Sequence, residues 1–164
     1  MDAFGWQRLS HRLYKKGIPK IPGLIQRYIH FRYNSDLNKA LVAGEGTRLG
    51  HGGIGVVVNK LCKLGRNCIL GQNVTLASKD GGAPELGDWV YVGANSVVLG
   101  GVKIGNNAFI GALTLVNKDV PENAVVIGIP AKVLKIRTQE EVDDWHRWVM
   151  QNGGAKIDDL EGAK

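Results

Sequence analysis

The chain is poor in cysteine, proline and acidic side chains. Its 164 residues include 2 Cys and 5 Pro, and 15 Asp and Glu stand against 21 Lys and Arg. Two cysteines are too few for a disulfide scaffold, and Cys62 and Cys68 lie outside any CxxC pattern. So little proline, without glycine at every third residue, excludes collagen. The sequence has no apolar run of 18 residues and no apolar segment after a charged start, so we expect a cytosolic protein without a membrane span.

Glycine, in contrast, is in excess. The 23 glycines make up about 14% of the chain, against a usual ~7%. A disordered linker is disfavoured, because 44% of the residues are apolar and only 22% are charged. The length fits one domain with a sizeable core. The glycines therefore belong to a folded, repetitive structure.

The net charge of +6 suits an anionic partner, and the basic residues gather near the N-terminus. Residues 1–39 hold eight of them against only two acids, Asp2 and Asp36. The eight are Arg8, Arg12, Lys15, Lys16, Lys20, Arg27, Arg32 and Lys39. This basic segment fits two interpretations: a solvated helix face, or a peripheral contact with an anionic membrane.

An aliphatic residue recurs every six positions from residue 64 onward, usually followed by glycine. These positions are Leu64, Leu70, Leu76, Leu86, Val92, Val98, Ile104, Ile110 and Val116. A small or β-branched residue stands two positions before each of them except Leu86. A period of six does not match the 3.6-residue turn of an α-helix, but it fits a short strand plus a turn, three of which close one coil. The spacing therefore predicts a β-solenoid whose aliphatic residues stack inside. The spacing of ten positions from Leu76 to Leu86, where six are expected, predicts an inserted loop at 78–85.

The segments that flank the repeat predict helices. Short helices are expected at 4–16 and 23–33, around a Gly- and Pro-rich breaker at 17–23. Thr138 and Glu141 have capping-box spacing, which predicts a helix after them, with a frayed tail from Gly153. We therefore expect an N-terminal helical segment at 1–35, a β-helix at 36–136, and a C-terminal helix and tail at 137–164.

Among four histidines, only His51 falls near the start of the coils, in the glycine-rich run 50–55. By itself it could be an exposed turn residue. However, residues 51–58 resemble the segment His-x-x-x-Gly-(Ile/Val)-Val-(Ile/Val) that carries the catalytic histidine of serine acetyltransferases and of polysaccharide O-acetyltransferases. The resemblance covers roughly residues 35–136 and includes the closing sequence 116–133. It implies a left-handed parallel β-helix, acetyl-coenzyme A as co-substrate, and a homotrimer with active sites between subunits.

The same resemblance implies roles for further residues. An aspartate fifteen residues before the catalytic histidine corresponds to Asp36, nearly one coil away, where it would orient His51 as a general base. Asp36 as a simple turn or cap residue stays open. The pantetheine arm and the phosphates of the coenzyme would be contacted by Gly93, Ala94, Gly111, Ala112, Lys118 and Lys132. No metal is expected.

Two departures from serine acetyltransferases concern the acceptor. Gly50 stands where they have an aspartate, and Gly82-Ala83-Pro84 stands where they have Arg-His-Pro. Their large N-terminal helical domain is also shortened here. These differences favour a sugar hydroxyl in capsular or exopolysaccharide biosynthesis, with serine as the alternative acceptor and no nucleic acid as a partner.

Three other mechanisms or functions use parts of the same sequence. A covalent route through Cys62 or Cys68 is disfavoured, since both occupy inward positions of the repeat. A zinc carbonic anhydrase needs three histidine ligands in the coils, where His51 stands alone. A non-catalytic module that docks its basic N-terminus on an anionic membrane or polymer is the alternative of a different class.

Overall fold

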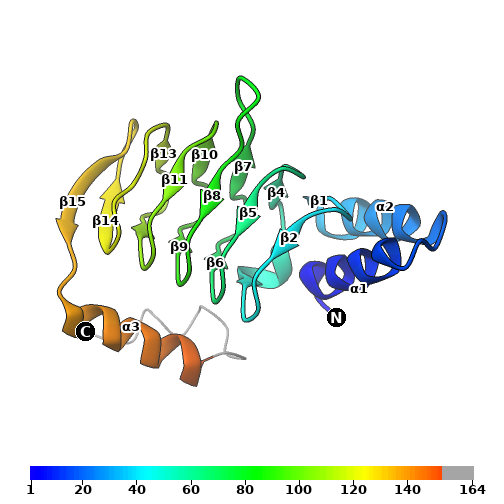
Figure 1. The fold of residues 1–164 in the computed structure, drawn as a ribbon, viewed down its shortest axis with the longest axis horizontal. Coiled ribbons are helices and arrows are strands. Elements are labelled where there is room, and N and C mark those ends of the chain that lie inside the picture. The colour runs from blue at the N-terminus through cyan, green and yellow to red at the C-terminus, as the bar shows by residue number, and fades with distance from the viewer. Residues whose placement is uncertain (153–164) are drawn as a thin grey trace.

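The computed structural model describes residues 1–152 as a three-sided parallel β-solenoid with helices at both ends (Figure 1). Helices α1 (Ala3–Lys15) and α2 (Ile21–Tyr33) form a hairpin against the first coil. The expected fraying from Gly153 lies outside the described residues. No helix within residues 1–152 has the length and apolar character needed to cross a membrane.

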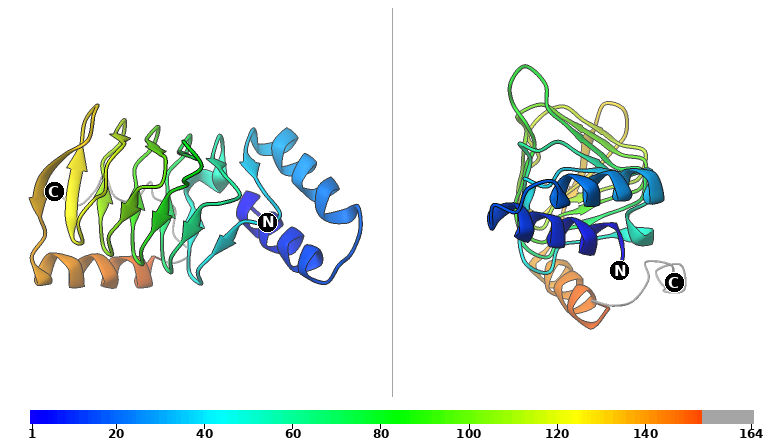
Figure 2. Two further views of the ribbon diagram at one scale, coloured as in Figure 1. Left: turned by 45° about the horizontal axis from the view of Figure 1, so that its top comes forward. Right: turned by 90° about the vertical axis from the view of Figure 1, so that its right-hand side faces the viewer.

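Three sheets form the sides of the solenoid, and each coil contributes one strand to each side (Figure 2). Sheet A contains β1 (Asp36–Leu37), β4 (Val57–Val58), β7 (Thr75–Ala77), β10 (Val97–Leu99) and β13 (Leu115–Val116). Sheet B contains β2 (Val42–Ala43), β5 (Lys63–Leu64), β8 (Glu85–Leu86) and β11 (Lys103–Ile104). Sheet C contains β3 (Arg48–Leu49), β6 (Ile69–Leu70), β9 (Tyr91–Val92), β12 (Phe109–Ile110), β14 (Ala124–Ile127) and β15 (Lys132–Ile136). All pairings are parallel except β14 with β15, and the fold is that of a left-handed β-helix, as expected.

The interior of the solenoid is built from the predicted repeat positions. All nine aliphatic residues are buried, with Leu64 the most exposed at 5%. The eight small or β-branched residues two positions earlier are buried as well, Val102 reaching 7%. A fully buried Val, Leu or Ile side chain contributes ~1.5–3 kcal/mol, so these ladders are the main source of stability in the coils.

The glycines that follow the aliphatic positions are required by the close stacking of coils. A Cβ on Gly93 would lie 2.4 Å from the backbone nitrogen of Ala112 in the next coil. A Cβ on Gly65 would lie 2.3 Å from the carbonyl oxygen of Gly87. Neither has a left-handed φ, so close approach of the backbones, and not turn conformation, selects glycine here.

The solenoid begins earlier than the six-residue period indicates. Leu37, Leu49 and Val58 are buried in strands that pair in register with later coils. Between Leu49 and Val58 the chain takes nine residues where six are usual, because the turn that carries His51 is longer. That longer turn interrupts the period and hides the first coil from the repeat pattern.

The C-terminal helix α3 (Gln139–Gln151) lies along sheet C (Figure 1). Its capping box between Thr138 and Glu141 is formed as predicted. Trp145 stands edge-on to Tyr91 and donates its indole N–H to the carbonyl of Trp89 at 3.1 Å. Aromatic packing and this bond hold the helix on the outer face of the sheet.

Candidate active site

His51 lies on a turn, residues 50–55, that leaves sheet C after Leu49 and enters sheet A at Val57; this segment is called the His51 turn below. The side chain is exposed, and its backbone has φ 48° and ψ 36°. A left-handed conformation is unfavourable for a residue with a side chain and persists only where neighbouring structure holds it. His51 is therefore a strained residue presented to solvent at the first coil.

Two contacts fix the His51 turn. Gly53 packs so closely that a Cβ there would lie 2.8 Å from Leu49 Cδ1 and 2.9 Å from Ala3 Cβ on α1. The buried Ser35 hydroxyl donates to the carbonyl of Gly53 and accepts from the backbone N–H of Val56 at 3.2 Å. Helix α1 and the start of the first coil thus set the position of the histidine.

Asp36 is the exposed first residue of β1, on the segment that bonds to the His51 turn. Its backbone N–H donates to the carbonyl of Val56 at 3.0 Å, and the Gly55 N–H donates to the carbonyl of Tyr33 at 3.0 Å. The start of the first coil, with Asp36, therefore lies beside the end of the His51 turn, where the next coil begins. A pairing between the two side chains stays a prediction.

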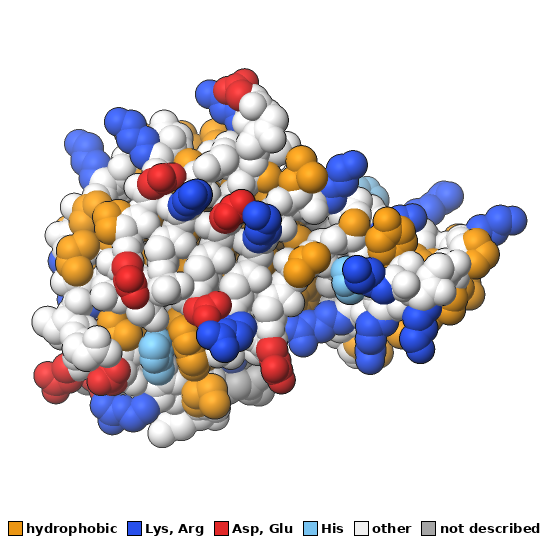
Figure 3. All heavy atoms as spheres, in the orientation of Figure 1, with side chains coloured by type: hydrophobic (Ala, Val, Ile, Leu, Met, Phe, Trp, Pro, Cys, Tyr) orange, Lys and Arg blue, Asp and Glu red, His pale blue; other side chains and the backbone are white. Residues whose placement is uncertain are grey.

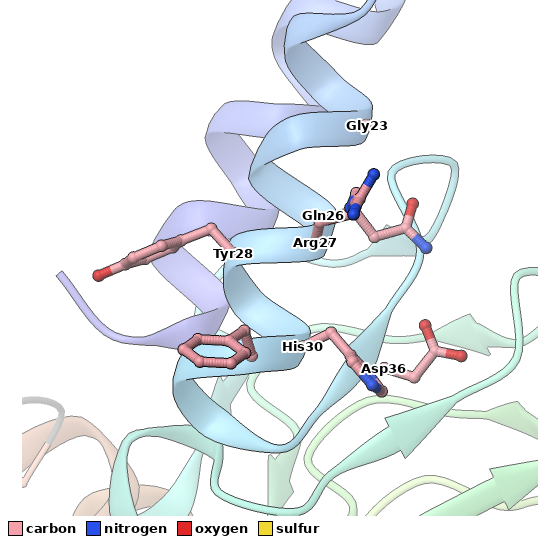
Figure 4. Close-up of a pocket in the computed structure, with 7 residues that line it drawn as sticks. Gly23, Gln26, Arg27, Tyr28, His30 and Asp36 are labelled. Carbon is pink, nitrogen blue, oxygen red and sulfur yellow. The ribbon is translucent and has the colours of Figure 1, made fainter.

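A cleft of about 540 Å³ lies between α2 and β1 beside Asp36 (Figure 4). Arg27 and His30 from α2 lie on the same side of the helix as Asp36, whereas Tyr28 points to the opposite side (Figure 4). The cleft is lined by Gly23, Gln26, Arg27, Tyr28, His30, Phe31 and Asp36. It offers charged groups of both signs next to the first strand of sheet A, which suits a small polar ligand.

The predicted coenzyme residues on the coils share one corner of the solenoid with His51. The turns that connect sheet C to sheet A include the His51 turn and the residues after β9 and β12, which contain Gly93-Ala94 and Gly111-Ala112. Gly93 is buried, whereas Ala112 is exposed. The two glycines are explained by the stacking of coils, whereas Ala94 is half-buried and Ala112 is exposed on this corner.

Two exposed apolar residues on the same corner were not identified from the sequence. Leu113 is 64% exposed and has a φ of 57°, where the two preceding coils have Asn73 and Asn95. Ile54, three residues after His51 on the same turn, is 53% exposed. The replacement of a corner asparagine by leucine was the available signal, because asparagine tolerates the left-handed region better.

The two predicted lysines lie at different corners, and both are exposed. Lys132 opens β15, directly after a turn whose Gly128 carbonyl accepts from the Leu115 N–H at 3.0 Å. Lys118 follows β13 at the corner between sheets A and B. The inserted loop at 78–85 projects from this second corner, where Lys79 and Gly82 exchange backbone hydrogen bonds of 2.9 Å.

Neither cysteine has the environment of a nucleophile. Cys62 and Cys68 are 2% and 0% exposed, and burial raises the pKa of each thiol to about 11. Both thiols are therefore protonated at neutral pH, in agreement with the sequence-based argument against a covalent route. Within residues 1–152, no three His, Cys, Asp or Glu side chains gather closely enough to hold a metal ion.

Comparison with known proteins identifies the family. Residues 84–118 match the family described as "Bacterial transferase hexapeptide (six repeats)". The serine acetyltransferase of Synechococcus elongatus is 34% identical over 160 residues, which cover 95% of this chain and 65% of that protein. The serine acetyltransferase of Staphylococcus aureus is 32% identical over 149 residues, which cover 86% of this chain and 70% of that protein.

Solved structures agree with these relatives. The serine acetyltransferase of Neisseria gonorrhoeae in complex with serine has a TM-score of 0.74 and 37% identity, over 79% of this chain and 54% of that one. The Brucella abortus enzyme in complex with coenzyme A has a TM-score of 0.76 and 28% identity, over 83% of this chain and 56% of that one. The chain thus spans a little over half the length of these structures, and it belongs to the serine acetyltransferase family of hexapeptide-repeat transferases.

Proposed function

We propose that the protein is an O-acetyltransferase that uses acetyl-coenzyme A and His51 as its general base. The observation that carries the proposal is the strained, exposed histidine at the start of a solenoid corner, held by Ser35 and α1. The family relationship supports it, and the coenzyme A complex of the Brucella enzyme indicates the acyl donor.

The reaction is a direct transfer of the acetyl group. His51 removes the proton from an acceptor hydroxyl as the oxygen attacks the thioester carbonyl. Asp36, at the start of the same coil, accepts a hydrogen bond from one ring nitrogen of His51 and so leaves the other ring nitrogen basic. A backbone N–H stabilises the oxyanion. When the carbon–sulfur bond breaks, His51 returns its proton to the thiolate, so the products are an acetyl ester and free coenzyme A.

For the coenzyme, we propose a path along the corner that follows the His51 turn. Ala94 and Ala112 offer small side chains beside backbone groups, and the exposed Leu113 adds an apolar contact for the pantetheine arm. Lys132 lies nearer this path than Lys118, which stands at another corner and would meet the phosphates only by a different route.

For the acceptor, the comparisons favour L-serine over the sugar that the sequence departures favoured. The relatives are serine acetyltransferases, and the Neisseria structure contains serine. A sugar hydroxyl stays the second candidate on one specific observation. Gly50 and the loop residues Gly82 and Ala83 supply no charged groups where serine acetyltransferases have Asp, Arg and His.

We also propose that the active protein is a cytoplasmic homotrimer that assembles through sheet A. The outward residues of this sheet form a largely apolar column of Val57, Thr75, Val97 and Leu115, which begins at Asp36. Sheet B presents charged residues instead, and sheet C is covered by α3. A subunit docked on sheet A would close the site beside Asp36, and light scattering after size exclusion would give the number of subunits.

The test is the release of coenzyme A from acetyl-coenzyme A, followed with a thiol reagent, with L-serine and with a panel of free and nucleotide-linked sugars as acceptors. We expect turnover with L-serine and a loss of ~10²–10⁴-fold in kcat for His51→Ala. His11→Gln, a histidine change on α1, is the matched control and should keep its activity. Turnover with sugars alone would select the second candidate. A folded His51→Ala variant with full activity would refute the mechanism, and no turnover with any acceptor would favour a binding module.

A further inference from the structure

Helix α2 has two apolar faces. One packs against the rest of the protein and includes the buried Pro22 and Ile29. The other, called the α2 stripe here, consists of Ile21, Leu24, Tyr28 and Phe31, which are 48%, 61%, 45% and 93% exposed. At 3.6 residues per turn these four lie within about 80° of one another, well away from the buried face. A second apolar face on a surface helix marks an interaction site.

The α2 stripe continues onto α1 through Trp6. The rings of Trp6 and Tyr28 meet edge-on with their centroids 5.2 Å apart. Trp6, Leu24, Ile25 and Tyr28 together line a shallow, largely apolar hollow of about 470 Å³. Trp and Tyr rings combine an apolar body with a polar tip, which suits the boundary between water and lipid.

Basic residues surround this apolar surface. Residues 1–39 carry eight Lys and Arg against two acids, of which Asp2 caps α1 and Asp36 belongs to the candidate active site. On the wheel of α2, Arg27 and Arg32 fall on opposite sides of the stripe. Figure 3 shows basic and apolar side chains side by side over the helical end, without acidic ones on this face. The positive charge of this surface indicates what it binds. Two copies of the surface would repel each other, whereas an anionic surface would be attracted.

We propose that the α2 stripe and its basic border bind the surface of an anionic phospholipid bilayer. The helix lies in the plane of the headgroups, with Phe31 and Leu24 inserted and the lysines and arginines at the phosphates. Attachment needs both signals, since apolar contact or basic charge alone gives only weak membrane binding. The 13 residues of α2 are too few to span a bilayer, so the contact is peripheral.

The experiment is flotation of the purified full-length chain with vesicles of phosphatidylcholine, with or without phosphatidylglycerol. We expect binding only when phosphatidylglycerol is present, and release as salt is raised. Phe31→Ser should weaken binding about ten-fold or more, because a fully buried Phe contributes ~1.5–3 kcal/mol. Lys16→Gln combined with Arg32→Gln should weaken it roughly 30-fold, because two basic residues near the surface together contribute ~2 kcal/mol.

Matched control variants distinguish binding through this site from non-specific binding to vesicles. Leu134→Ser removes an apolar side chain that is 63% exposed on β15, at the far end of the solenoid, and Lys103→Gln removes a basic group from sheet B. Both should bind vesicles like the unmodified chain. Equal binding to neutral vesicles, or binding that survives Phe31→Ser, would overturn the proposal. The proposal would also be overturned if the unmodified chain bound no vesicles and Phe31→Ser lowered the particle mass measured by sedimentation. In that case the stripe would join copies of the chain.

Discussion

Ser35→Ala should reduce activity more than its effect on stability would suggest. The Ser35 hydroxyl is 1% exposed and links the first coil to the His51 turn through the Gly53 carbonyl and the Val56 N–H. Removing it leaves two backbone groups with fewer partners in a buried position, which costs ~1–3 kcal/mol of the free energy of unfolding. The freed turn then shifts His51, and a displacement of about 1 Å can lower kcat on the order of 10²-fold.

Thr47→Val is the matched control for this prediction. The Thr47 hydroxyl makes the same pair of contacts at a different corner, donating to the Gly65 carbonyl at 2.7 Å and accepting from the Cys68 N–H at 3.0 Å. Its loss should destabilise the protein by a similar ~1–3 kcal/mol in urea unfolding, yet leave kcat unchanged. The reasoning is refuted if both variants lose activity equally, or if Ser35→Ala loses stability alone.

Three further predictions concern chemistry and stability in the coils. Cys62 and Cys68 should resist thiol reagents at neutral pH until the chain unfolds. Folding raises the pKa of both thiols to about 11. The free energy of unfolding, measured in urea, should therefore fall as pH rises from about 9 to about 11. Asp88→Asn should cost at most about 1 kcal/mol at neutral pH, and the difference should disappear as pH falls below the ordinary pKa of an aspartate, because a paired guanidinium lowers the pKa of Asp88. Gly93→Ala should lower the thermal midpoint of unfolding, since its Cβ would meet the next coil at 2.4 Å, whereas Gly23→Ala meets nothing within 4 Å and should not; equal midpoints for the two would contradict the stacking argument.

The repeat could be predicted from the sequence because every coil applies the same rule to the same positions. Burial at Leu64, Leu76 and Val98 follows from a period that no helix shares. The first coil escaped the pattern, since the His51 turn lengthens the spacing between Leu49 and Val58. A functional turn that departs from the repeat therefore conceals the coil that carries it.

The candidate site was predictable only in part. The glycine-rich run predicted an exposed His51, and the structure pairs Asp36 with Val57, directly after the His51 turn. The corner of the solenoid to which a surface residue belongs depends on the order of the strands in the sheets. The six-residue repeat alone therefore did not show that Lys118 and Lys132 lie at different corners. The α2 stripe was likewise hidden, because its residues lie between core positions in the sequence and separate from them only on the folded helix.

The helix along sheet C changes how the solenoid unfolds. In a solenoid each coil touches only its neighbours, so coils can be lost one at a time from an exposed end. Helix α3 departs from this rule, since Arg48 in the first coil donates to the carbonyl of Val149 at 3.4 Å while Trp145 holds the middle coils. Contacts that join residues 101 positions apart make the ends of the stack depend on each other. Unfolding should therefore be a single cooperative transition, and the His51 turn in the first coil shares in the stability of the whole stack.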